Sequence, residues 1–467
     1  MLKKILKGTG IAVLVLVILI LLFVGPWPTY GPSDVKKERY FQKVVADIDN
    51  NLKESELTAT PDRLRAGWGK ASITPPLGTP LAGFDKRKGK PSTGVHDELY
   101  AKALALSDGR DTVVLVGSDM LIVPNNVAEK ARELVQAQTQ LTANDIFFNS
   151  SHTHSGPGAW GPGYMAKAFS GTYDPAIVEF LAKQFSAAII DAYNDLKLAD
   201  LASGSVDAPE YILNRTRDAG VDSELSYLIA RKKDGQSCYL VSFSAHPTLL
   251  GGDNMEFSGD YPGYLQRLLE VKTGQFGMYL GGALGSMGSK IDGPDGFTRA
   301  LNMGESLAKL VLEDAEKATF SDQLDVASVG FAFRSPSLQF RLNRNWRLSP
   351  NFLPLLGVDS LGWIQGVRVG NLLFYGTPCD MSGEISAEMK KWADQRGVDL
   401  WVCSFCGDYL GYVSPQKYYD QEKDEAGEYE MYIMSWMGPN QEPFFTNIMQ
   451  HMIDTMFAAP APAVAKR

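Results

Sequence analysis

The sequence predicts an α/β protein with a layered mixed β-sheet core flanked by helices, preceded by one N-terminal transmembrane helix. From about residue 65 onward, short apolar runs typical of buried strands alternate with amphipathic stretches typical of helices. The composition is that of a globular protein, with 45% hydrophobic and 21% charged residues. A separate apolar run stands close to the N-terminus, outside this alternation.

The N-terminal segment has the layout of a signal sequence or signal anchor. Lys3, Lys4 and Lys7 precede an apolar run at 11–24, and no convincing small-residue cleavage site follows the run. We therefore expect residues 1–30 to remain as a transmembrane anchor, with secretion after signal cleavage as the alternative. Because lysines favour the cytoplasmic side, the rest of the chain is expected on the extracytoplasmic side, in the periplasm or at the cell surface.

The remaining chain divides by composition into three further regions. Residues 31–64 are charged and polar and predict a stalk or linker, with an amphipathic helix at 36–55. Residues 65–456 carry the strand and helix pattern and predict one catalytic domain. Residues 457–467, rich in alanine and proline, predict a disordered tail.

Strand-like and helix-like segments alternate within residues 65–456. The strands are continuous apolar runs, which is typical of strands buried on both faces, and the helices show apolar spacing of three and four. We expect strands at 112–120, at the start of 145–156, and at 238–247, 276–283 and 400–405, and helices at 125–138, 174–196, 261–272 and 381–396.

Several polar residues stand at or just after the ends of expected strands: Asp119, His152 with His154, His246 and Asp380. In open α/β sheets, functional sites gather in the loops that follow strand ends. The positions therefore indicate one site, although polar residues also end strands for structural reasons.

Histidine is scarce in this chain, with five in 467 residues, yet two of them occur together in “NSSHTHSGPGAW” at 149–160. Residues i and i+2 of an extended segment point to the same side, so His152 and His154 are expected to face one pocket. Zinc prefers imidazole nitrogen and carboxylate oxygen, and catalytic zinc keeps one position open for water. His152, His154 and His246, or two of them with an acid such as Asp380, would form such a site; a structural histidine pair is the alternative.

Net charge and cysteine content exclude other classes of protein. The formal net charge is −9 and no long basic block occurs, so nucleic acid is not an expected partner. Four cysteines in a chain of this length exclude a disulfide scaffold. Cys403 and Cys406 have C-x-x-C spacing, and we interpret both as small core residues, with a disulfide as the alternative.

A series of motifs extends from about residue 66 to about residue 455. In chain order they are “GWGKASITPPLGTPLAGF”, “GVHDELYAKALAL”, “VGSDM”, “SHTHSGPGAW”, “ILNRTR”, “FSAHPTLLGG” with “FSGDYPGYL”, “YGTPCDMSGE” and “CGDYLGYVSP”. This series resembles the neutral/alkaline (non-lysosomal) ceramidase family, N-terminal catalytic domain. The resemblance implies a zinc amidase that cleaves the N-acyl bond of ceramide into a sphingoid base and a fatty acid.

The resemblance also implies a set of zinc ligands. His152 and His246 match the two histidine ligands of the family. Asp380 stands where the family has a ligating glutamate, and Tyr412 matches an unusual tyrosine ligand. His154 matches the residue that moves protons to and from the zinc-bound water.

Arg215 and Tyr429 match residues that stabilise the oxyanion formed when the amide is attacked. Among the other acids, Asp119 and Asp260 are expected to orient the imidazoles. A turn at a strand end is the alternative role for Asp119, and a helix cap is the alternative for Asp260.

The segment “GGALGSMGSK” at 281–290 departs from the family, which carries an acid here, followed by serine and proline. Ser286 replaces the acid, Ser289 stands one position after the family's serine, and the proline is missing. Two alternatives to a ceramidase follow from this change: a non-catalytic lipid-binding protein, or a zinc hydrolase of another amide or ester. A lipid partner and a membrane remain expected in each case.

Overall fold

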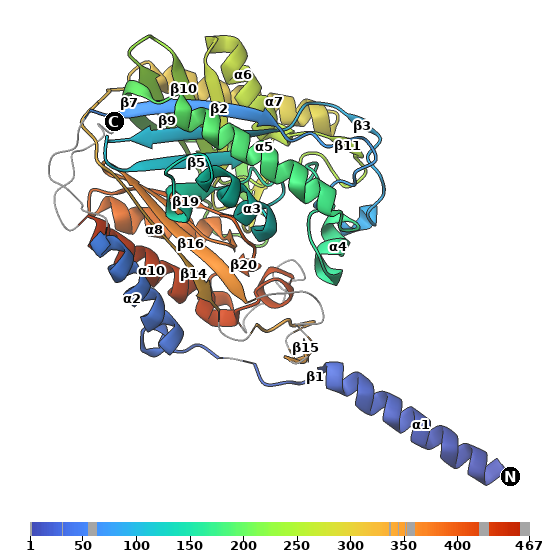
Figure 1. Cartoon of the computed structure of the whole chain (residues 1–467). Coiled ribbons are helices and arrows are strands. Elements are labelled where there is room, and N and C mark those ends of the chain that lie inside the picture. The colour runs from blue at the N-terminus through green and yellow to red at the C-terminus, as the bar shows by residue number, and fades with distance from the viewer. Residues whose placement is uncertain are drawn as a thin grey trace.

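The computed structural model describes residues 2–29, 31–54, 63–335, 338–343, 345–350, 352, 360–419 and 429–457. They form a mixed α/β body from which one N-terminal helix projects (Figure 1). The α/β class expected from the sequence is confirmed. Of the expected tail at 457–467, everything from 458 onward lies outside the described residues.

The largest sheet has eight strands in the order β12-β10-β9-β7-β2-β4-β5-β6. Two of its strand pairs, β10 with β12 and β5 with β6, are parallel, and the other pairs are antiparallel. Along the sheet, the strands are β12 (Phe276–Gly281), β10 (Ser237–Phe243), β9 (Glu224–Lys232), β7 (Lys197–Asp207), β2 (Arg65–Ser72), β4 (Tyr100–Ser107), β5 (Thr112–Ser118) and β6 (Ile146–Phe148).

The ends of strands β6 and β12, at opposite edges of this sheet, are joined by one side chain. Asn149, directly after β6, accepts a hydrogen bond from the N–H of Gly281 (2.6 Å) and donates one to its carbonyl (3.1 Å). An asparagine amide can pair with both backbone groups of another residue, as a neighbouring strand would. The sheet therefore curls, and the loops after β6, β10 and β12 meet.

The second sheet has four strands in the order β14-β16-β17-β19, and its last pair is parallel. Its strands are β14 (Val326–Arg334), β16 (Leu361–Val369), β17 (Leu372–Gly376) and β19 (Asp399–Cys403). Within the described residues there are also four two-stranded pairs: β1 (Val24–Gly25) with β15 (Arg347–Leu348), β3 (Gly94–Val95) with β11 (Glu256–Phe257), β8 (Ile212–Asn214) with β13 (Met287–Ser289), and β18 (Asp380–Met381) with β20 (Tyr412–Val413).

Helices cover the sheets (Figure 1). Helix α5 packs closely on β2 because β2 has glycines on that face: a Cβ atom at Gly67 would lie 2.3 Å from the carbonyl oxygen of Ala192. The helices of the body are α2 (Arg39–Glu54), α3 (Asn125–Gln136), α4 (Tyr164–Ser170), α5 (Pro175–Asn194), α6 (Asp260–Thr273), α7 (Gly296–Ala315), α8 (Gly383–Asp394) and α10 (Gln441–Met456).

Each of the nine strands and helices expected between residues 112 and 405 is present, with boundaries that differ by a few residues. Strands β2, β4, β7, β9, β14, β16 and β17 were not among the expected elements. Cys403 and Cys406 are buried free thiols in hydrophobic cores, which agrees with their interpretation as small core residues.

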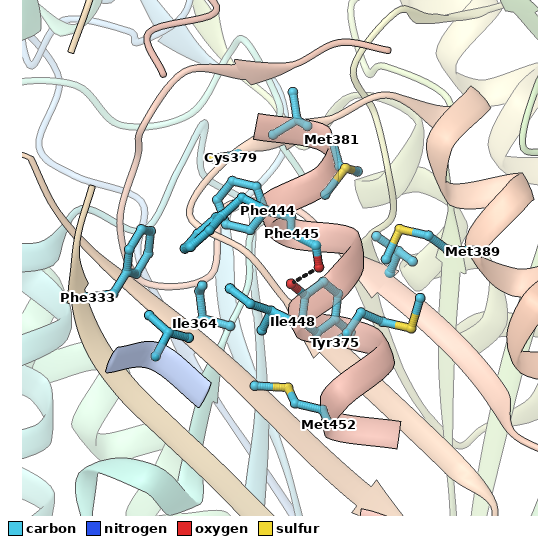
Figure 2. Close-up of a cluster of buried hydrophobic side chains, with 14 of the residues drawn as sticks. Phe333, Ile364, Tyr375, Cys379, Met381, Met389, Phe444, Phe445, Ile448 and Met452 are labelled. Atoms are coloured by element: carbon cyan, nitrogen blue, oxygen red, sulfur yellow. Dashed lines mark hydrogen bonds between the residues drawn. The ribbon is translucent and has the colours of Figure 1, made fainter. Parts of the chain in front are cut away.

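The expected stalk helix is part of the folded body. Phe41, Val44, Ile48 and Leu52 lie on one face of α2 and are buried in the core between α10 and the second sheet. Figure 2 shows that core, in which the hydroxyl of Tyr375 donates a hydrogen bond to the carbonyl of Phe445 (2.8 Å). Residues 39–54 are therefore not a free linker.

Helix α1 (Leu2–Phe23) projects from the body, with the N-terminus of the chain at its free end (Figure 1). Its residues Leu6–Phe23 have a mean hydropathy of 2.7, and none of them is buried. By length and composition this helix is a candidate membrane span.

Candidate functional site

Three imidazoles converge where the loops after β6 and β10 meet. The Nε2 atom of His154 lies 3.3 Å from Nε2 of His152 and 3.2 Å from Nε2 of His246. Among the described residues, these three histidines form a group whose ligand atoms all lie within 4.8 Å of one another. The sequence expectation that both members of the H-x-H pair face one pocket is met, and the third histidine joins them.

Backbone carbonyls orient two of the rings. Nδ1 of His152 lies 2.6 Å from the carbonyl oxygen of Leu121, and Nδ1 of His246 lies 3.3 Å from that of Leu284. A carbonyl only accepts, so each Nδ1 carries the proton and each Nε2 turns a lone pair toward the centre. Two lone pairs that face one point repel each other unless a cation or a donor lies between them.

Two close contacts hold the H-x-H segment in place. The ring of Phe405 stacks on the ring of His152, with centroids 4.0 Å apart and planes 5° from parallel. Both residues have positive φ, 60° and 65°, a costly conformation for side chains of this size. Gly83 leaves room for His154, because a Cβ atom there would lie 2.7 Å from the Cβ atom of His154.

Burial keeps the three imidazoles neutral. Desolvation lowers the pKa of His152 to about 3, and Arg215 lowers it further while the bond to Leu121 opposes the shift. Burial also lowers the pKa values of His154 and His246, which lie well below the ordinary value for histidine. Neutral imidazole is the form that binds metal ions.

This donor set fits a zinc ion. Nitrogens bound to tetrahedral zinc at about 2.0–2.1 Å are separated by roughly 3.4 Å, close to the Nε2 distances of His154. The buried Nδ1 atom of His154 has no hydrogen-bond partner, and the Nε2 atom of the same ring faces the other two histidines. A metal ion would also remove the repulsion between the facing lone pairs.

Asp380 and Tyr412 lie beside the histidines on the paired strands β18 and β20, directly opposite each other. Asp380 is not one of the side chains in the 4.8 Å group, which among the described residues contains histidines alone. Both of its carboxylate oxygens are buried, and the hydroxyl of Tyr412 faces them from the opposite strand. Burial raises its pKa to about 8, and the charge of Arg215 opposes that rise.

Arg215 links Tyr412 to an acid that the sequence analysis did not select. Its Nη2 donates to the hydroxyl of Tyr412 (3.1 Å), and its Nε and Nη2 donate to Oε1 of Glu430 (3.3 and 3.2 Å). Glu430 is only 2% exposed. Burial would lower the pKa of Arg215, but Tyr412, Glu430 and Asp380 raise it above its ordinary value, so the guanidinium stays charged.

Tyr429 stands next to Glu430 in one turn of π-helix, Tyr429–Ile433. Its ring centroid lies 6.3 Å from that of Tyr412, and 41% of its surface is exposed. Burial of the phenol raises its pKa, so it carries its proton at neutral pH. The structure thus brings together all seven residues expected as ligands or catalytic groups, with Tyr429 at the edge of the site.

Asp119 and Asp260 do not bond to the imidazoles, whose Nδ1 atoms pair with carbonyls or have no partner. Asp119 accepts hydrogen bonds from the N–H of Tyr100 (2.9 Å) and the amide of Gln266 (3.0 Å). Asp260 accepts from the N–H of Leu250 (3.0 Å) at the first turn of α6. Asp119 thus links β5 to β4 and α6, and Gly259, not Asp260, occupies the N-cap position of α6.

The hydroxyl groups of the two serines in the altered segment donate hydrogen bonds to backbone carbonyls. Ser286, with a φ of 60°, donates to the carbonyl of Gly285 and contacts the hydroxyl of Ser382 at 2.7 Å. Ser289 donates to the carbonyl of His246 (2.7 Å). Burial raises the pKa of Glu430, and the backbone of Ser286 is among the groups that oppose this shift, so a carboxyl group lies beside position 286, where the family carries an acid.

Two cavities meet at the histidines. One, of about 360 Å³, has mostly apolar walls, among them Leu121, Trp160, Met165, Phe169, Met434 and Trp436. The other, of about 870 Å³, is more polar and includes Lys86, Arg215, Thr216, Thr248, His246 and Glu430. His154, Tyr412 and Tyr429 line both cavities. An amphipathic molecule fits this arrangement, with its polar bond at the imidazoles.

Comparisons with known proteins agree with the motifs. Residues 64–279 match the family described as neutral/alkaline non-lysosomal ceramidase, N-terminal. The crystal structure of neutral ceramidase from Pseudomonas aeruginosa is similar to this chain with a TM-score of 0.71 and 18% identity, over 87% of this chain and 76% of that one. A ceramidase complexed with C2 is similar with a TM-score of 0.71 and 17% identity, over 87% and 77%. At these identities the structures establish a shared fold, and together with the family match they confirm that the chain is similar to the neutral/alkaline non-lysosomal ceramidases.

Proposed function

We propose that this protein is a zinc-dependent amidohydrolase that cleaves the N-acyl bond of ceramide or a related N-acyl lipid. The observation that carries the proposal is the convergence of three neutral imidazoles, two buried and one half-buried, at the junction of an apolar and a more polar cavity. Ceramide has an amide that joins an acyl chain to a sphingoid base, and the base carries hydroxyl groups next to the amide. The family match and the shared fold support the same reaction class.

Within this proposal, His152, His154 and His246 hold the zinc ion. The Nε2 distances of His154 suit a third ligand, and they also suit the hydrogen bonds that the proton-transfer role implied by the resemblance would need. Asp380 is one methylene shorter than the family's glutamate and lies outside the histidine group. Tyr412, which lines both cavities, is the fourth side chain that would approach the metal.

The reaction needs an activated water, a polarised carbonyl and a proton for the leaving amine. Bound zinc would supply an activated water near neutral pH and polarise the amide carbonyl. Arg215, held charged between Tyr412 and Glu430, stabilises the oxyanion. Tyr429 donates a second hydrogen bond to the oxyanion, and its phenol holds a proton next to the polar cavity that receives the amine.

The test is product analysis with a long-chain ceramide. The zinc-loaded chain is expected to release fatty acid and sphingoid base in equal amounts, and His152→Ala is expected to reduce the rate at least ~100-fold. His451→Gln, in α10 and bonded to Asp49 far from the site, is the matched control and should keep the wild-type rate. Cleavage of an ester analogue alone would indicate another hydrolase, and ceramide binding without cleavage would indicate the lipid-binding alternative that the 281–290 segment raises.

A further test separates the two roles of His154. If this residue is a ligand, His154→Ala weakens zinc binding by one to two orders of magnitude in a chelator competition. If it only moves protons, zinc affinity stays unchanged and kcat alone falls. The cobalt-substituted protein gives a second readout, since loss of an imidazole ligand changes its visible spectrum.

We also propose that α1 crosses a membrane and leaves the body on the extracytoplasmic side. Its length, its hydropathy and the lysines that precede its apolar part support this assignment. Extraction at alkaline pH should leave the full chain in the membrane fraction, and protease added outside should digest the body. Release of a soluble chain shortened by about 25–30 residues would instead indicate a cleaved signal.

A further inference from the structure

The end of helix α1 is tied to the body by backbone pairing. Strand β1 runs antiparallel to β15, with Val24 opposite Leu348. The N–H of Ser349 donates to the carbonyl of Phe23 (2.8 Å), and the ring of Phe23 packs edge-on against that of Phe352, with centroids 4.8 Å apart. The candidate span therefore passes directly into a sheet pair instead of a loose linker.

Arg347 holds this pair from the inside. It is almost fully buried, and its Nη1 and Nη2 donate to the carbonyls of Pro28 (2.6 Å) and Leu338 (3.2 Å). A buried guanidinium needs such partners, so the residues that supply them are held in position. We call residues 23–28 together with 338–343 and 345–349 the juxtamembrane clamp.

A second tie lies a few residues further along the chain. Asn440, before α10, accepts a hydrogen bond from the N–H of Ser33 (2.8 Å) and donates to the carbonyl of Gly31 (3.2 Å). Two separate attachments on one short segment prevent the body from swivelling freely about the end of α1. The orientation of the body relative to the bilayer normal is then restricted.

The juxtamembrane clamp also contacts the wall of the apolar cavity. The N–H of Leu348 donates to the carbonyl of Phe340 (2.8 Å), and the ring of Phe340 stacks on Trp436, with centroids 4.6 Å apart. Trp436 lines the apolar cavity. Only one side chain thus separates the clamp from the cavity that would receive an acyl chain.

Two large apolar side chains project from the turn of the clamp. Leu342 is 48% exposed and Trp346 is 41% exposed, and the turn is closed by a hydrogen bond from the N–H of Leu342 to the carbonyl of Trp346 (2.8 Å). Tryptophan is the side chain that favours the interface between membrane and water. In Figure 1 this turn, near the label β15, lies beside the end of α1.

We propose that the juxtamembrane clamp seats the body on the bilayer that holds α1, with Leu342 and Trp346 inserted among the lipids and the apolar cavity beside them. The partner of this surface is the lipid bilayer itself. The proposal rests on the membrane anchoring proposed above, and it implies that a lipid substrate enters the cavity from the same membrane.

The test places a probe at the turn in the full chain, reconstituted in vesicles of phosphatidylcholine and phosphatidylglycerol. Trp346→Cys is labelled with an environment-sensitive fluorophore, since the four native cysteines are buried. Val271→Cys is the matched control, because Val271 is 80% exposed on α6, far from α1 in Figure 1. Spin-labelled lipid is expected to quench the probe at position 346 at least threefold more than the probe at position 271.

The outcomes separate the clamp from the anchor. Failure of the full chain to float with the vesicles would contradict the anchoring. Flotation with equal, weak quenching at both positions would overturn the clamp. Arg347→Ala should float but lose the excess quenching at position 346, and Arg347→Lys, which keeps the charge without the fork, should lose part of it while the body stays folded.

Discussion

At the scale of single residues, the site depends on side chains that hold other side chains. Phe405 stacks on His152, and Glu430 holds Arg215. Neither contacts the centre of the three imidazoles through a polar atom, yet each fixes the direction of a group that would meet the substrate or the metal. Substitutions at these two positions therefore test how far the chemistry depends on orientation.

Phe405→Leu keeps an apolar side chain but removes the flat contact with the imidazole of His152. We expect zinc affinity to fall by about tenfold in a chelator competition, while folding stability falls by about 1–2 kcal/mol. Phe148→Leu, which is also buried and packs edge-on against another ring, Phe185, is the control. Equal zinc affinity in both variants would contradict an orienting role for Phe405.

Glu430→Gln removes the charge that pairs with the buried side of Arg215. The amide oxygen of glutamine still accepts hydrogen bonds from the guanidinium, so this variant removes the ion pair but keeps the hydrogen bonds. We expect kcat/KM to fall by about tenfold or more and stability by about 1–3 kcal/mol. Glu210→Gln, at an exposed position, is the control and should change neither kcat/KM nor stability. Wild-type kcat/KM in Glu430→Gln would show that the charge of Glu430 has no role in the reaction.

Asp260 makes stability depend on pH. Burial raises its pKa from 3.8 to about 6, so the folded chain holds this proton when the unfolded chain has lost it. The stabilisation that this proton gives the folded chain is complete below pH 3.8 and is lost as the pH rises to about 6. The free energy of unfolding then falls by about 3 kcal/mol. Compared with Asp260→Asn, the wild type should therefore lose unfolding free energy between pH 4 and pH 7. Parallel stability curves for the two proteins would show that Asp260 ionises normally.

At the scale of elements, the clearest difference between the sequence-based expectation and the structure is that helix α2 packs on the body. Its amphipathic pattern predicted the helix correctly, but its charged composition suggested a stalk. An apolar face of four residues is enough to dock a helix when a matching surface exists, and a single sequence does not display that surface. Here the surface is formed by α10 and the second sheet.

Ile48→Ala tests the docking of α2. The side chain is fully buried, so its loss should cost about 2–5 kcal/mol of unfolding free energy. Gln42→Ala, on the exposed face of the same helix, should cost less than about 0.5 kcal/mol. Chemical denaturation of the two variants measures the difference, and equal midpoints would mean that α2 does not belong to the cooperative body.

At the scale of the whole molecule, periodicity predicted many of the alternating strands and helices, and the H-x-H motif predicted that two histidines share a pocket. Arg215, Tyr412 and Tyr429 were expected only from the family resemblance. The sequence did not predict Glu430, which lies 215 positions from Arg215 and has no motif around it. It also did not predict the curl of the main sheet, which brings the loops together through Asn149 and Gly281. Both depend on tertiary contacts between segments whose spacing carries no local signal.

The chain combines a candidate anchor, a body tied to it, an apolar cavity near that tie and a group of imidazoles at the cavity's inner end. In the proposed function, an enzyme that acts on membrane lipids would need its apolar cavity close to the membrane anchor and its catalytic group in the wall of that cavity. In the same proposal, the more polar cavity that shares His154, Tyr412 and Tyr429 with the apolar one would receive the polar part of the substrate.

The most direct test of the central claim is the rate of fatty-acid release from ceramide as zinc is added stepwise to the metal-free protein. The account predicts no release without metal, a rate that rises in proportion to bound zinc, and saturation at about one ion per chain. Full activity in the metal-free protein, or zinc binding at that stoichiometry without any release from the folded chain, would contradict it.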